Sequence, residues 1–182
     1  MTRHGEWFLS LKGRQTYPFD MRPEDVDIEE IAHSLSNLCR FQGHCRAFYS
    51  VAQHSVLVSR NVPPEIALQG LLHDATEAYC GDMIRPIKRQ MRDYVQPETR
   101  IQYAIWEHFD LPRWSLDPRV KVADNRALQT ERRDLLAPHR WAWQEDQIAD
   151  PGSVPFPERI EPWKPSVAKY AFLDEYVHLT RP

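Results

Sequence analysis

A histidine and two acidic residues stand in an otherwise largely apolar stretch, residues 66–79, which the hydrophobic pattern predicts to be a helix buried on nearly all sides. Buried acids need partners. The adjacent His73 and Asp74 offer nitrogen and oxygen ligands for a metal ion. Glu77, four residues after His73 and three after Asp74, projects beside them, where it can act as a base toward a metal-bound water. On these residues alone, a core histidine with helix-end acids stays open.

Two further residues of the same chemistry lie in other predicted helices. His54 belongs to a helix predicted over residues 48–59, an antiparallel neighbour of the first, so His54 can face His73. A histidine there is more often a satisfied core residue. Asp124 lies on the apolar stripe of a helix predicted over residues 118–136, where a lone carboxylate is costly. Two imidazoles and two carboxylates suit Zn²⁺, Mn²⁺, Co²⁺ or Fe²⁺ and leave open positions for water and a substrate oxygen.

The other elements must position these residues, and most are predicted to be helices. Asp27 and Glu30 form a capping-box pattern at the start of a helix that ends near Cys39. Glu131 shares the apolar stripe of Asp124 and is interpreted as a partner of basic residues. The predicted elements are a hairpin of residues 7–11 and 15–19, helices over 28–39, 48–59, 64–79, 97–109, 118–136 and 166–179, and an ordered, non-helical, proline-rich excursion over 149–165.

Length, charge and cysteine content narrow the class of protein. The 182 residues suit one domain, 1–182, with its core in 28–136. The formal net charge of -3 argues against nucleic acid as the main partner. The apolar runs are short, and the N-terminus has no signal-peptide pattern, so we expect a soluble cytoplasmic protein without a membrane partner. The 3 cysteines lack C-x-x-C spacing and are expected to be reduced core residues.

Basic residues flank the histidine and acid positions on both sides. Arg40 and Phe41 are adjacent in a loop, predicted because Gly43 breaks the helix there. If residues 83–93 are helical, their basic residues share one face. A solvated basic surface is the alternative interpretation. The candidates in this second segment are Arg85, Pro86, Lys88, Arg89 and Arg92.

Five short motifs carry a resemblance to a known family: VAQHS at 51–55, LLHDATE at 71–77, GD at 81–82, PxK at 86–88 and KVAD at 121–124. With them the chain resembles the HD-domain phosphohydrolases, in particular the bacterial 5′-deoxynucleotidases, and is similar to phage dATP triphosphohydrolases in the same places. The resemblance covers roughly residues 28–136. The bacterial enzymes have tryptophan where this chain has Phe41, and their loop between His54 and His73 is longer, so the base preference does not carry over.

The resemblance implies a fold and a set of roles. The fold would be all-α, an HD-domain helical bundle with the small N-terminal hairpin. A divalent transition metal would be held by His54, His73, Asp74 and Asp124. Glu77 would orient or deprotonate the attacking water, and Asp82 would protonate the leaving 5′-oxygen or hold a second ion such as Mg²⁺. Substrate contacts would come from Arg40, Phe41, Gly43, Arg85, Pro86, Lys88 and Arg89.

The expected reaction is metal-dependent hydrolysis of the 5′ phosphoester of a small-molecule deoxynucleotide. The basic residues after the HD motif favour a deoxynucleoside triphosphate, since it brings about four negative charges. Resemblance to the phage enzymes favours dATP, with deoxynucleoside and triphosphate as products. A dNMP 5′-deoxynucleotidase is the alternative, and a non-catalytic HD scaffold or binding module is a further one. A nucleotide second-messenger hydrolase would need more sequence outside the bundle. The protein is expected to be a homo-oligomer.

Overall fold

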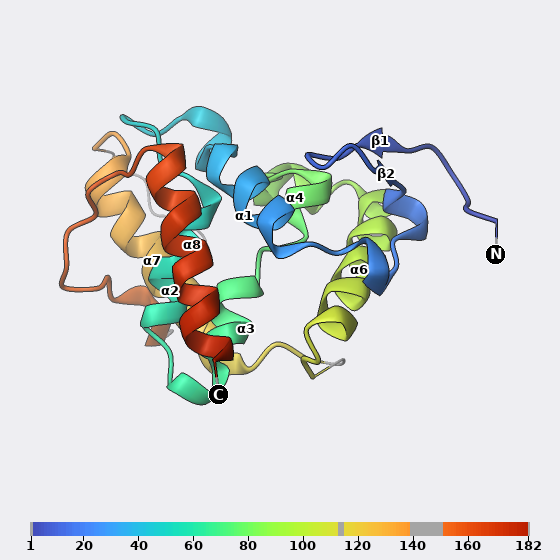
Figure 1. Ribbon diagram of the computed structural model, residues 1–182. Helices are drawn as coiled ribbons and strands as arrows, with labels where there is room; N and C mark the ends of the chain where they lie inside the picture. The colour runs from blue at the N-terminus through green and yellow to red at the C-terminus, as the bar shows by residue number, and fades with distance from the viewer. Residues whose placement is uncertain (1, 113–114, 139–150, 182) are drawn as a thin grey trace.

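The computed structural model describes residues 2–112, 115–138 and 151–181. Within them the chain is mostly helical and carries a two-stranded sheet near its N-terminus (Figure 1), which confirms the predicted all-α fold with a small hairpin. None of the described helices combines the length and hydrophobicity that a membrane span requires. The helices are α1 (Ile28–Asn37), α2 (Val51–Arg60), α3 (Ala67–Leu72), α4 (Glu77–Cys80), α5 (Arg85–Lys88), α6 (Arg92–His108), α7 (Pro118–Leu135) and α8 (Pro165–Thr180).

The predicted hairpin is present, with shorter strands. β1 (Phe8–Leu9) pairs antiparallel with β2 (Gln15–Thr16). Gly13 lies in the connecting turn with a φ of 72°, a conformation that a glycine adopts without strain. The second strand ends because Pro18, which has no N–H to continue the ladder, begins a 3₁₀ helix over Pro18–Asp20. The hairpin is fastened to α1 where Ser10 Oγ donates to Glu30 Oε1 at 2.7 Å.

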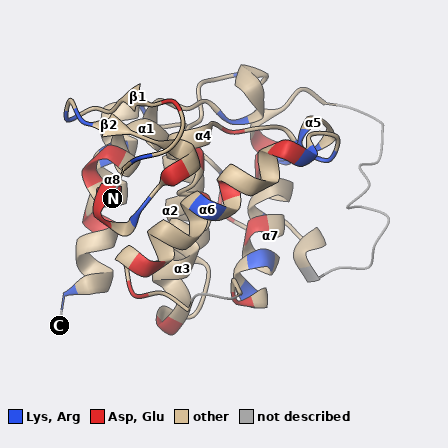
Figure 2. Ribbon diagram, turned by 90° about the vertical axis from the view of Figure 1, so that its right-hand side faces the viewer, with Lys and Arg blue, Asp and Glu red and all other residues tan. Residues whose placement is uncertain are grey.

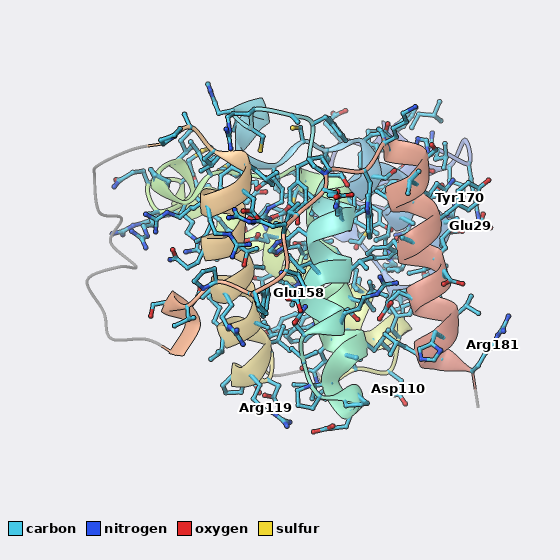
Figure 3. The ribbon with its side chains drawn as sticks, turned by 90° about the vertical axis from the view of Figure 1, so that its left-hand side faces the viewer. Glu29, Asp110, Arg119, Glu158, Tyr170 and Arg181 are labelled. Atoms are coloured by element: carbon cyan, nitrogen blue, oxygen red, sulfur yellow. The ribbon has the colours of Figure 1, made fainter. Side chains whose placement is uncertain are left out.

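Side-chain caps fix where α1 and α2 begin. Asp27 accepts hydrogen bonds from the backbone N–H groups of Glu29 and Glu30, as its capping position predicts. Ser50 caps α2 by accepting from the N–H of Gln53 at 3.1 Å, so α2 starts later than the predicted residue 48. α2 packs against α3, and α8 packs against both α1 and α2. Figure 3 shows α8 beside α2, with Tyr170 pointing into solvent.

The helix predicted over residues 64–79 is interrupted at the histidine. α3 ends at Leu72, the chain turns through residues 73–76, and α4 starts at Glu77. The backbone there hydrogen-bonds three residues back instead of four: the N–H of Ala75 donates to the carbonyl of Leu72, and that of Glu77 to the carbonyl of Asp74. This tighter winding stacks side chains three residues apart. It therefore places Glu77 over Asp74.

The basic segment is not one helix. α5 covers only Arg85–Lys88, and α6 begins at Arg92, five residues before the predicted start at Pro97. Pro97 lies inside α6 as a buried residue, at the loss of one backbone hydrogen bond. No continuous helical face therefore carries all four basic residues of this segment, Arg85, Lys88, Arg89 and Arg92. Figure 2 shows basic residues on α5, above α7.

The hydrophobic core has a larger and a smaller part. The larger one joins the buried faces of α1, α2, α3, α6 and α8 and includes Leu35, Leu71, Ile105 and Phe172. The smaller one joins α2 and α7 to Phe156 of the proline-rich segment. The helix predicted over 118–136 and the C-terminal helix over 166–179 correspond to α7 and α8 within one residue at each end.

The proline-rich excursion follows α7 back toward α2. Of the predicted 149–165, residues 149 and 150 lie outside the described residues. A short 3₁₀ helix, Pro151–Ser153, precedes an irregular stretch. The N–H of Phe156 donates to Thr130 Oγ1 at 2.8 Å, and that of Ile160 to Asp134 Oδ2 at 3.0 Å. These bonds explain why the segment is ordered although most of it lacks regular structure.

Candidate metal centre

Three of the predicted ligands come together from α2, the turn after α3, and α7. The Nε2 atoms of His54 and His73 are 3.2 Å apart. Asp124 Oδ1 lies 3.3 Å from His54 Nε2 and 4.0 Å from His73 Nε2. One ligand atom of each residue lies within 4.8 Å of those of the other two, so the group could hold a metal ion. His54 is fully buried, and Asp124 is 8% exposed.

Asp74, the fourth predicted ligand, adjoins both histidines. Its Oδ2 lies 3.1 Å from His73 Nε2 and 3.5 Å from His54 Nε2. The same oxygen is 3.5 Å from Nη1 of Arg40. The side chain of Asp74 is 23% exposed, more than those of both histidines, so this is the open side of the centre.

The outer nitrogens of the two histidines decide what their inner nitrogens can do. His73 Nδ1 lies 2.8 Å from the carbonyl oxygen of Gly70, which can only accept, so Nδ1 carries the hydrogen. His54 Nδ1 lies 2.7 Å from Glu131 Oε1, a carboxylate, so it is likewise the donor. Both Nε2 atoms of the neutral histidines then present lone pairs to the oxygens of Asp74 and Asp124. Such a group of four acceptors is stabilised by positive charge at its centre.

The pKa values of these groups reflect that requirement. Burial raises the pKa of Asp124, but contact with His54 and His73 outweighs it and holds that pKa well below its ordinary value. At Asp74, burial acts to raise the pKa, but the contact with His73 outweighs burial and lowers the pKa below its ordinary value. Burial lowers the pKa of His54, yet Glu131 and Asp124 raise it to about 9. A metal ion bound at this centre would supply positive charge to these carboxylates and would compete with a proton on His54.

The donor set fits a divalent transition metal. Imidazole nitrogens and carboxylate oxygens are the ligands that Zn²⁺, Mn²⁺, Co²⁺ and Fe²⁺ bind, and each histidine donates its other N–H to an oxygen, as metal-bound histidines do. The identity of the ion stays a prediction. Asp124 also has cationic neighbours: Lys121 Nζ lies 2.6 Å from its Oδ2 atom, and Arg85 Nη2 lies 3.7 Å from the same atom.

The predicted substrate contacts divide into two groups. Arg40 and Arg85 reach the ligand carboxylates, and the guanidinium carbon of Arg40 lies 5.4 Å from the ring centre of Phe41. Phe41 itself has a positive φ of 55° in the tight turn before Gly43, whose φ is 81°. In the second group, Lys88 pairs with Glu98 of α6, while Pro86 and Arg89 are exposed.

Glu77 and Asp82 are the predicted acid and base residues. Burial raises the pKa of Glu77 well above its ordinary value, and the negative charges of Asp74 and Asp82 raise it further. Among the described residues, Glu77 Oε2 is buried without a hydrogen-bond partner. Asp82 is half-buried; burial raises its pKa, and its backbone carbonyl accepts a hydrogen bond from Gln42 Nε2. Glu77 is therefore an unpaired acid beside the centre.

A cavity of about 370 Å³ borders His73, Asp74 and Glu77 and has α6 as its far wall. Glu98, Gln102 and Trp106 contribute to that wall, and we did not predict a site role for any of them. They are spaced four residues apart and so share one face of α6. Their common face, which lies beside the apolar stripe of α6, was the signal that the sequence offered. Tyr103 and Thr99 also line the cavity.

Comparisons with known proteins identify relatives. The chain is 49% identical over 126 residues to the uncharacterized protein YfdR of Escherichia coli (strain K12), covering 69% of this chain and 70% of YfdR. It is 35% identical over 142 residues to the uncharacterized protein RCAP_rcc00048 of Rhodobacter capsulatus, covering 71% of this chain and 72% of that protein. No known protein family profile matches the chain.

Proposed function

The chain belongs to the family of YfdR from Escherichia coli, and we propose that it is a metal-dependent phosphohydrolase of deoxynucleotides. One observation carries the proposal. The Nε2 atoms of His54 and His73 converge with carboxylate oxygens of Asp74 and Asp124, while Nδ1 of each histidine is bound to an oxygen outside the centre. The resemblance to HD-domain phosphohydrolases, which rests on the same residues, supplies the reaction class.

Glu77 is the residue that would handle the proton of the attacking water. Glu77 lines the cavity next to Asp74, and its raised pKa makes it a stronger base than an ordinary carboxylate, which suits a group that takes a proton from water. When bound, a divalent ion at this centre polarises a phosphoryl oxygen and lowers the pKa of a water molecule. Asp82, with its raised pKa, would give a proton to the leaving 5′-oxygen.

Phosphate oxygens would be bound by cations that already surround the centre. Arg40 Nη1 and Arg85 Nη2 lie 3.5 Å and 3.7 Å from ligand carboxylates, longer than a strong charged hydrogen bond, so both groups would be near enough to the centre to share a phosphate oxygen. The base and sugar would lie in the cavity against α6, where Trp106 and Gln102 offer an aromatic surface and an amide. A phosphate at the centre thus has a neighbouring space for a nucleoside.

The length of the phosphate chain is the finer question. We retain a deoxynucleoside triphosphate, with dATP favoured by the family resemblance, as the proposed substrate. Two structural facts favour the alternative, a dNMP 5′-deoxynucleotidase. Lys88 is already paired with Glu98, and Arg92 belongs to a different helix from Arg85. Both facts reduce the positive charge available for a triphosphate tail.

Product analysis tests the proposal. The metal-loaded protein is incubated with deoxynucleoside mono-, di- and triphosphates and with ribonucleotide counterparts, and both products are identified. Release of intact triphosphate supports the triphosphohydrolase, and release of phosphate from monophosphates alone supports the 5′-deoxynucleotidase. The Glu77→Gln protein loaded with the same metal serves as control for contaminating phosphatase. Metal binding without turnover of any nucleotide would favour the non-catalytic binding module.

A further inference from the structure

Glu131 on α7 is a buried carboxylate beside the centre that the proposed reaction leaves without a role. It is fully buried, and both of its oxygens are engaged. Oε1 accepts from His54 Nδ1 at 2.7 Å. Oε2 accepts from Arg40 Nη2 at 3.1 Å and from Arg40 Nε at 3.3 Å. Burying such a charge is costly unless it is paired and hydrogen-bonded, as both oxygens are here.

The contacts of Glu131 close into a ring. Arg40 continues through Nη1 to Asp74 Oδ2 at 3.5 Å, and Asp74 Oδ2 returns to His54 Nε2 at 3.5 Å. Within Glu131, Arg40 contacts only Oε2. The second oxygen, at 2.7 Å, is placed where it can act on His54.

We infer that Glu131 is a positioning residue for the metal centre. Its carboxylate holds the hydrogen of His54 on Nδ1, which directs the Nε2 lone pair to the position between His73 and Asp124. Arg40 in turn fixes the orientation of the carboxylate. The inference rests on the proposed function to the extent that the centre binds a metal ion, but it does not depend on the substrate.

Co²⁺ binding to the whole chain tests the inference without any activity measurement. Glu131→Gln keeps the size of the side chain and removes its charge. It should bind Co²⁺ about 10- to 100-fold more weakly than the natural protein, by calorimetry, and change the visible absorption of bound Co²⁺. Glu175→Gln is the matched control, since Glu175 is a buried carboxylate with one oxygen on Ser59 and the other on Arg60. It should leave both readouts unchanged.

The outcomes separate this inference from the proposed function. If Glu131→Gln binds Co²⁺ with the affinity and visible absorption of the natural protein, while Asp74→Asn loses Co²⁺, the inference about Glu131 is overturned and the proposed function is not. Failure of the natural protein to bind Co²⁺ would overturn both. If Glu131→Gln does not fold, the natural protein loaded with Zn²⁺ gives the answer through ¹⁵N NMR of its imidazoles. Hydrogen on Nδ1 of His54 supports the inference, and hydrogen on Nε2 contradicts it.

Discussion

Replacing Glu77 by glutamine should raise stability while it removes activity. In the folded protein Glu77 is half-buried; its Oε2 atom is buried and, within the described residues, has no hydrogen-bond partner. An unsatisfied buried polar group costs about 1–3 kcal/mol, and more when it is charged. Glutamine keeps the shape of the side chain without the charge. The unfolding temperature of Glu77→Gln should therefore rise by about 2–4 °C for each kcal/mol gained in the free energy of unfolding. Turnover should fall by about 10²–10⁴, the usual contribution of a general base.

The pH dependence of this difference follows from the direction of the pKa shift. Burial and the nearby Asp74 raise the pKa of Glu77, so the folded state holds this proton more tightly than the unfolded state. The natural protein therefore loses stability as the pH rises from the ordinary carboxyl pKa of about 4.3 toward the raised folded value. Glutamine has no such loss. The stability advantage of Glu77→Gln should be small at pH 4 and grow toward neutral pH.

Thermal unfolding of the metal-free proteins at several pH values, with phosphate release by the metal-loaded ones, measures both effects. Glu98→Gln is the stability control, because Glu98 lines the same cavity but is paired with Lys88. It should be no more stable than the natural protein. A Glu77→Gln protein that is less stable at every pH, or that keeps natural turnover, would refute the assignment of Glu77 as an unpaired buried base.

The other predictions concern the metal and the Arg-Phe pair. Zn²⁺ at 100 times its dissociation constant should stabilise the natural protein by about 2.7 kcal/mol, seen as a higher unfolding temperature that a chelator reverses; an unchanged temperature would argue against the centre. Asp74→Asn should lose the metal on elemental analysis yet keep its far-UV circular dichroism, and a fully metallated, active variant would exclude Asp74 as a ligand. Arg40→Ala should reduce turnover of every nucleotide, whereas Phe41→Ala should mainly change the ranking among bases; an unaltered ranking would place base selection elsewhere.

The sequence predicted the residues of the centre better than the backbone that carries them. His54 and Asp124 could be found because a polar residue on an apolar stripe indicates a buried polar site, whatever the details of the helices. The break between α3 and α4 could not be found, because tightening from four-residue to three-residue hydrogen bonds leaves the apolar pattern of residues 66–79 unchanged. The pattern reports burial, and it does not report small changes in winding.

Long-range contacts account for the other differences. Residues 83–93, which would share one basic face if they were helical, are divided between α5 and the start of α6, and contacts with groups outside the segment accompany this division. Lys88 pairs with Glu98, and the hydroxyl of Tyr94 donates to the carbonyls of Cys80 and Gly81 at 3.2 and 3.1 Å. These contacts fold the segment back against α6. The α6 face that carries Glu98, Gln102 and Trp106 lines the cavity. The sequence could not predict this, because local periodicity cannot distinguish a solvated face from one that lines a cavity.

Gly70 connects the fold to the chemistry of the centre. A Cβ at this position would lie 3.1 Å from the Cα of Ser59 and 3.2 Å from Val62 Cγ2, so the absence of a side chain permits the close approach of α3 to α2. The same two helices position the histidines, whose Nε2 atoms lie 3.2 Å apart. The carbonyl of Gly70 lies in the last turn of α3, where carbonyls lack helical partners, and it accepts the Nδ1 hydrogen of His73 instead. Gly70 thus permits the close packing of α3 on α2, and its carbonyl also fixes which nitrogen of His73 faces the metal position.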